Sequence, residues 1–160
     1  MLDKKRGIVG VAGEFFVAAE LSQRGIVATL TLKNTPSLDI LATNLENGRF
    51  ANIQVKTMSI NNHSGWRLGR KDEEPSGIQN HYYVFVNLKG IGQVPEYIII
   101  PQLKIAEFIR KTHQAWLSGA KKDGSKRKDT DIRVFNPYIN TSAHELAKKY
   151  INSWEILELW

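Results

Sequence analysis

Four polar residues between positions 14 and 56 carry the groups that could do chemistry. Asp39 begins a short apolar run, and Gln54 and Lys56 alternate with apolar residues along a second one. Glu14 lies near the centre of the apolar arc of a predicted helix, where a carboxylate needs a cationic partner because burying an unpaired charge is costly. We therefore expect a lysine or another cation, such as a metal ion, close to Glu14.

The elements that must position these residues are a helix and a hairpin. Residues 7–24 predict a helix whose apolar side chains recur at i, i+3 and i+4 spacing, namely Val11, Phe15, Ala18 and Leu21. Residues 38–43 and 50–58 predict two strands, joined by a turn in which Asn47-Gly48 is a strong hairpin signal.

This hairpin predicts which side chains meet. Because side chains alternate along a strand, Gln54 and Lys56 share one face, which we expect the first helix to cover. Strand pairing brings Asp39 beside Gln54, so the helix, with Glu14, would complete the group.

The rest of the chain predicts a mixed sheet with helices on both faces. The fold class is therefore α/β, a single three-layer α/β/α domain with a central mixed β-sheet covering residues 1–160. Further strands are expected at 26–32, 81–88, 96–100 and 132–135, helices at 103–117 and 142–152, and long loops at 59–80 and 119–131.

The combination of Glu14, Asp39 and Gln54-Val55-Lys56 resembles the PD-(D/E)XK nuclease superfamily. It is most similar to the branch with a helix-one glutamate and Q-x-K in place of E-x-K, which includes Holliday-junction-resolvase-like and uncharacterised bacterial members. The resemblance is strong over residues 7–60 and general elsewhere. It implies a restriction-endonuclease-like fold.

The resemblance also implies an activity, the metal-dependent hydrolysis of phosphodiester bonds in DNA by a nuclease of repair, restriction or mobile-element type. Its catalytic residues would be Glu14, Asp39, Gln54 and Lys56. Mg²⁺, or Mn²⁺, would be held by Glu14, Asp39, the side-chain oxygen of Gln54 and the backbone carbonyl of Val55. Lys56 would orient the attacking water or stabilise negative charge on phosphorus.

The glutamine leaves an alternative open. The Gln54 amide adds no charge to a metal site, although the inward Glu14 could compensate. The alternative is a catalytically inactive nucleic-acid-binding or protein-interaction domain on the same scaffold.

The formal charge of +6 and the pI near 9.5 favour an anionic partner. DNA is the expected partner, and RNA is a second one. Two loops carry cationic and aromatic side chains that would contact nucleic acid, as alternatives to being solvated loops. These residues are His63, Trp66, Arg67, Arg70 and Lys71, and Lys121, Lys122, Lys126, Arg127 and Lys128.

Several classes of protein are excluded or disfavoured. The chain has no cysteine, which rules out disulfides and thiolate chemistry and fits a cytoplasmic protein. No apolar run is long enough to span a bilayer, so no membrane association is expected. The four histidines lack the spacing of a zinc motif. Many nucleases of the resembled family pair two sites, which makes a homodimer one expected assembly.

Overall fold

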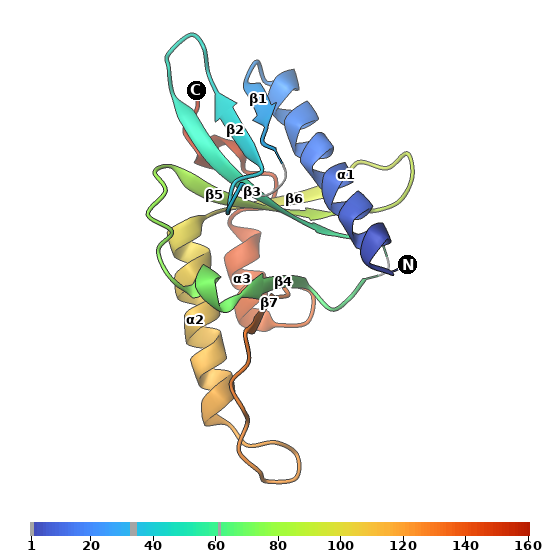
Figure 1. The fold of residues 1–160 in the computed structure, drawn as a ribbon, viewed down its shortest axis with the longest axis vertical. Coiled ribbons are helices and arrows are strands. Elements are labelled where there is room, and N and C mark those ends of the chain that lie inside the picture. The colour runs from blue at the N-terminus through green and yellow to red at the C-terminus, as the bar shows by residue number, and fades with distance from the viewer. Residues whose placement is uncertain (1, 33–34, 61) are drawn as a thin grey trace.

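A five-stranded mixed sheet forms the centre of the structure (Figure 1). The structure is a computed structural model that describes residues 2–32, 35–60 and 62–160, with side chains from residue 7 onwards. The sheet strands are β1 (Val27–Leu30), β2 (Ile40–Thr43), β3 (Phe50–Met58), β5 (His81–Asn87) and β6 (Glu96–Pro101). A separate two-stranded sheet pairs β4 (Trp66–Gly69) with β7 (Ile132–Phe135).

The strand order of the main sheet is β1-β2-β3-β5-β6, so β3 lies in the middle. The first three strands form an antiparallel meander, with Ile40 opposite Ile53. β5 then runs parallel to β3, which places Gln54 opposite Tyr83 and Lys56 opposite Phe85.

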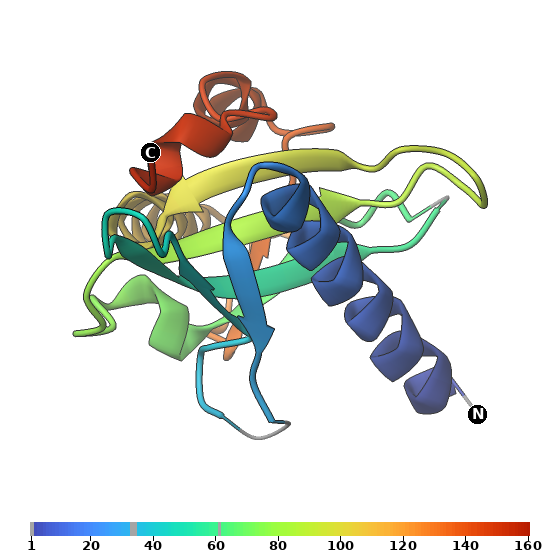
Figure 2. The ribbon, with the colours of Figure 1, turned by 90° about the horizontal axis from the view of Figure 1, so that it is seen from above.

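Helix α1 (Leu2–Gln23) covers one face of this sheet (Figure 2). Its buried Val17 and Leu21 pack with side chains from β2, β3 and β5, including Ile53 and Val55. The C-terminal turn η2 (Trp154–Leu157) contributes to the same apolar cluster.

The other face is covered by α2 (Gln102–Ser118), α3 (Thr141–Lys148) and the small sheet. Tyr83 and Phe85 from β5 pack here against Ile105 and Ile109 of α2 and Phe135 of β7. The expected mixed sheet with helices on both faces is therefore confirmed.

A glycine determines how α1 meets the sheet. A Cβ atom on Gly13 would lie 1.9 Å from Oγ1 of Thr57, so only glycine permits this close approach of α1 to β3. The buried face of the helix runs through Gly13, Val17 and Leu21, whereas Phe15 is 59% exposed. The apolar spacing that predicted the helix included Phe15, and its assignment to the buried face is wrong because the close approach selects small residues.

The predicted long loop at 59–80 is also wrong in part. It contains β4 and a 3₁₀ turn, η1 (Arg70–Glu73). β4 is four residues long and pairs with β7, which lies far along the chain, so local sequence gives little sign of it.

The last helix ends at Lys148, earlier than expected, and its N-cap is Asn140, which accepts a hydrogen bond from the Ala143 N–H. No helix among the described residues is long and apolar enough to cross a membrane.

Candidate functional site

Asp39 is held against β3 by its side chain as well as its backbone. The Asp39 N–H donates to the Ile53 carbonyl at 2.9 Å, and its Oδ2 accepts the Val55 N–H at 2.7 Å. The carboxylate therefore takes the place of a backbone acceptor at the end of the β2–β3 ladder. The predicted meeting of Asp39 with the Gln54-Val55-Lys56 segment is confirmed.

Gln54 and Lys56 lie on the face opposite to α1. Their neighbours Ile53 and Val55 pack with α1, and alternation turns the two polar side chains toward the face of Tyr83 and Phe85. The expectation that α1 covers Gln54 and Lys56 is therefore wrong. Glu14 is half-buried on α1, and its role as a metal ligand stays a prediction.

A second carboxylate reaches this face from η1. Asp72 is 5% exposed, and its two oxygens accept hydrogen bonds of 2.7 Å from the Tyr83 hydroxyl and the Gly69 N–H. The sequence did not single out Asp72, since it stands in the charged run Arg70–Glu74. The usable signal was its spacing, because an acidic residue three positions after Gly69 is typical of the start of a helical turn.

Lys56 lies among these charges. Burial lowers the pKa of its ammonium, the nearby Asp72 and Asp39 carboxylates act in the opposite direction, and Lys71 adds to the lowering. Lys56 forms no ion pair in the described residues within the salt-bridge distance of 4.0 Å. A half-buried ammonium in this position can serve an anionic ligand.

Two buried polar atoms on this face lack a hydrogen-bond partner among the described residues, Oε1 of Gln54 and Nε2 of His81. The other ring nitrogen of His81 lies 2.7 Å from Oγ of Ser76, and burial lowers the pKa of this histidine. The His81 ring also lies against the ring of Tyr83, with centroids 5.6 Å apart. Such unpaired atoms are rare in native interiors and often indicate a bound water or ion.

The oxygen donors present fit Mg²⁺ or Mn²⁺. The Asp39 carboxylate and the unpartnered Gln54 Oε1 are the hard ligands that these ions prefer, and the chain adds backbone carbonyls such as that of Val55. Within the described parts of the chain, no three acidic or histidine side chains are grouped so that they could hold a metal ion by themselves. A site here would thus rely on an amide, on backbone oxygens and on substrate phosphate.

The residues expected to bind nucleic acid have different positions. Trp66 is 2% exposed, donates its indole N–H to the Val86 carbonyl and stacks on Phe135, so the expectation that it contacts nucleic acid is wrong. The indole serves as the anchor of β4 in the core. His63 and Arg67 are exposed.

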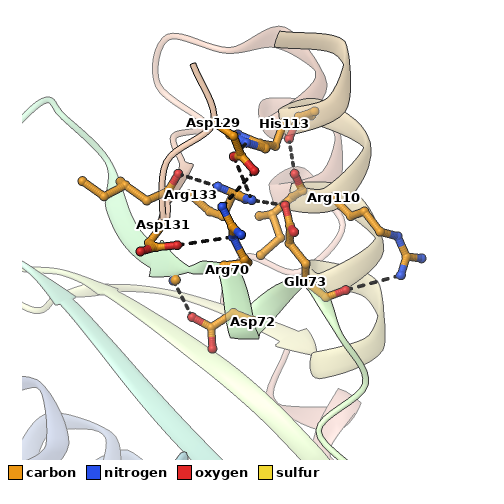
Figure 3. A network of polar contacts seen from close by, with 12 residues as sticks. Arg70, Asp72, Glu73, Arg110, His113, Asp129, Asp131 and Arg133 are labelled. Atoms are coloured by element: carbon orange, nitrogen blue, oxygen red, sulfur yellow. Dashed lines mark hydrogen bonds and ion pairs between the residues drawn. The ribbon is translucent and has the colours of Figure 1, made fainter. Parts of the chain in front are cut away.

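Lys71 and Arg70 both lie on η1. Lys71 is exposed, with its ammonium 3.4 Å from Oγ of Ser37. Arg70 pairs with Asp129 at 2.8 Å and with Asp131 at 3.3 Å, within a polar network shown in Figure 3.

The loop at 119–131, which carries five of these basic residues, leaves α2 at the far end of the molecule from the main sheet (Figure 1) and returns along the helix, where Asp129 contacts His113. Lys121, Lys122, Lys126 and Lys128 are exposed. Arg127 instead folds back on Trp116, donating to its carbonyl with the guanidinium 5.0 Å from the ring centroid.

No family model, curated protein or solved structure matches this chain. The resemblance to the PD-(D/E)XK superfamily therefore stays a prediction from the residues of the site.

Proposed function

We propose that this protein hydrolyses phosphodiester bonds of DNA with the help of Mg²⁺ or Mn²⁺. The observation that carries the proposal is the meeting of Asp39, Gln54 and Lys56 on one buried sheet face, where Gln54 Oε1 has no partner among the described residues. A carboxylate, a free amide oxygen and an ammonium together can bind a cation and a phosphate. The resemblance of residues 7–60 to a nuclease family points to the same chemistry.

Each side chain would have a defined task. Asp39, with Gln54 and the Val55 carbonyl, would hold the metal, and Glu14, which comes from the helix on the other face of the sheet, would contact it through water. The bound ion supplies Lewis-acid activation of water and phosphate. The Lys56 ammonium would stabilise the negative charge that develops on the phosphate oxygens, a task for which a compact point charge is suited.

The restriction-endonuclease-like form of the fold is part of this proposal. The antiparallel β1-β2-β3 meander supports it, with α1 on one face, Asp39 immediately before β2, and Gln54 and Lys56 on β3. The rival is a binding domain without catalysis, in which Lys56 only balances Asp72 and Asp39.

The test is a comparison of Lys56→Met with the parent protein. We expect Lys56→Met to bind duplex DNA within a few-fold of the parent and to lose Mg²⁺-dependent cleavage by about 100-fold or more, the scale of losing one transition-state charge contact. The matched control is Lys148→Met, which removes the same charge from an exposed position on α3. Single-turnover cleavage, with circular dichroism to verify folding, gives the answer.

A second variant probes the amide. Gln54→Glu adds a charge to the ligand set, and we expect it to tighten Mn²⁺ binding by about tenfold, or roughly 1.4 kcal/mol. Calorimetric titration measures this. Cleavage by Lys56→Met at the parental rate would overturn the catalytic role of Lys56, and a parent that neither binds Mn²⁺ nor cuts DNA would favour the binding domain.

A further inference from the structure

The distribution of charge on the molecule is uneven. The segment from Arg110 to Asp131, here called the basic arm, holds seven basic and three acidic side chains, a formal charge of +4 out of +6 for the whole protein. No residue of α2 beyond Ile109 is buried, so the second half of the helix and the following loop project from the core (Figure 1). Most of the net positive charge therefore lies away from the main sheet.

The acidic residues of the arm do not neutralise its lysines. Asp129 and Asp131 turn toward Arg70, Arg133 and His113, as Figure 3 shows, and Asp123 accepts hydrogen bonds from Ser125. Lys121, Lys122, Lys126 and Lys128 form no ion pair in the part of the chain that the structure describes. Four exposed ammonium groups therefore remain available to an anionic partner.

The arm is braced rather than loosely attached. The Arg133 side chain is 3% exposed, pairs with Glu73 of η1 through Nε, and lies 3.6 Å from Asp129. His113 on α2 contacts Asp129 at 2.7 Å, and this hydrogen bond is the main reason why the pKa of Asp129 is lowered. These contacts join the loop both to α2 and to η1, the turn that carries Asp72.

The brace also fixes the distance between the arm and the candidate site. α2 begins beside η1, since the Gln102 amide donates to the Glu74 carbonyl at 2.7 Å. Its 17 residues at 1.5 Å each give about 25 Å from Gln102 to the far end of the helix, just before Lys121 and Lys122. At about 3.4 Å per base pair this equals roughly seven base pairs of duplex.

We propose that the basic arm is a second phosphate-binding surface, which contacts the backbone of duplex DNA about seven base pairs from the candidate site. The inference rests on the proposed function and adds a substrate class, an extended duplex. A rigid duplex fits because the arm is held at a fixed distance. The outward-facing Arg67 on β4 lies on the small sheet between the main sheet and the arm (Figure 1).

The test measures binding to DNA hairpins with stems of about 6 to 20 base pairs in EDTA. Each affinity is corrected for the number of positions at which the protein can bind along the stem. Lys121→Gln/Lys122→Gln should lower the slope of log affinity against log salt by about two on long stems and leave it unchanged on stems below about seven base pairs. The matched control is Lys148→Gln/Lys149→Gln on and just after α3, which should match the parent at every length.

An equal loss at all stem lengths, or no loss at any, would overturn the arm contact. Single strands of the same lengths bend freely, so the effect of the variant on them should not appear abruptly at a particular length. The same abrupt dependence on length with single strands would overturn the duplex assignment. The measurement needs no cleavage. A clear length step in a protein that never cuts DNA would support the arm and reject the hydrolysis, whereas cleavage without a length step would reject the arm alone.

Discussion

At the scale of single residues, the polar face depends on a hydrogen bond between two buried side chains. The Tyr83 hydroxyl donates to Asp72, and burial, followed by this hydrogen bond, raises the pKa of Tyr83 far above its ordinary value. Asp72 is also the carboxylate that acts most strongly on the Lys56 ammonium, so Tyr83 orients the group that balances this charge. Tyr83 thus helps to organise the site without belonging to the expected motif.

Tyr83→Phe should therefore destabilise the fold. We expect a loss of about 1–3 kcal/mol, because Asp72 keeps its burial and loses a donor. Denaturant unfolding measures the change. The control is Tyr138→Phe. The Tyr138 hydroxyl donates a hydrogen bond to Glu96, but Tyr138 is 44% exposed, so water can replace the lost hydroxyl. Equal losses in the two variants would contradict a special role for the buried pair.

At the scale of elements, η1 links the site to the arm through Arg133 and Glu73 (Figure 3). The guanidinium also donates to the carbonyls of Thr130 and Ile132, so it fixes the start of β7. Two neighbouring residues of η1 therefore contact different parts of the molecule. Asp72 contacts Tyr83 of the main sheet, and Glu73 pairs with Arg133, which holds the arm.

Arg133→Met tests the brace. We expect it to cost about 3–5 kcal/mol, since it removes one partner of a mostly buried ion pair and leaves Glu73 uncompensated. The control is Arg110→Met, whose contact with Glu74 is 4.0 Å and exposed, and which should cost no more than about 1 kcal/mol. Thermal unfolding compares them, and tryptic cleavage at the arm lysines should become faster only in Arg133→Met. Unchanged proteolysis would show that the arm is held by other contacts.

At the scale of the whole molecule, the two ends of the chain close one apolar cluster. Leu159 is fully buried with Val17 and Leu21 of α1, and its carbonyl accepts hydrogen bonds from Asn44 and Asn47 in the β2–β3 turn. The residues of the predicted single domain are thus connected through shared packing.

Leu159→Ala should destabilise the entire chain by about 2–5 kcal/mol, because the truncated side chain leaves a cavity in the core. We expect circular dichroism and tryptophan fluorescence to report the same lowered unfolding transition, as in a two-state domain. Val134→Ala, at an exposed strand position, is the control with little effect. Separate transitions for the two signals would contradict the single domain.

The sequence by itself determined the hairpin and the residues that meet on it. Asn47-Gly48 fixed the turn, with Gly48 at a φ of 71°, and the period of two along residues 50–58 put Gln54 and Lys56 on one side. These features follow from neighbouring residues, since register and alternation are local properties of a hairpin. The order of helices and strands likewise determined the class of the fold.

Only the tertiary structure decided which face of the sheet α1 covers. β3 is buried on both faces, so the polar pair could have faced either layer, and alternation alone does not distinguish them. The deciding contacts are non-local: Gly13 fits against Thr57, Trp66 packs into the core, and Asp72 arrives on a turn that is fixed by β4–β7 pairing. Such contacts join residues far apart in the chain, so a local pattern in the sequence does not predict them.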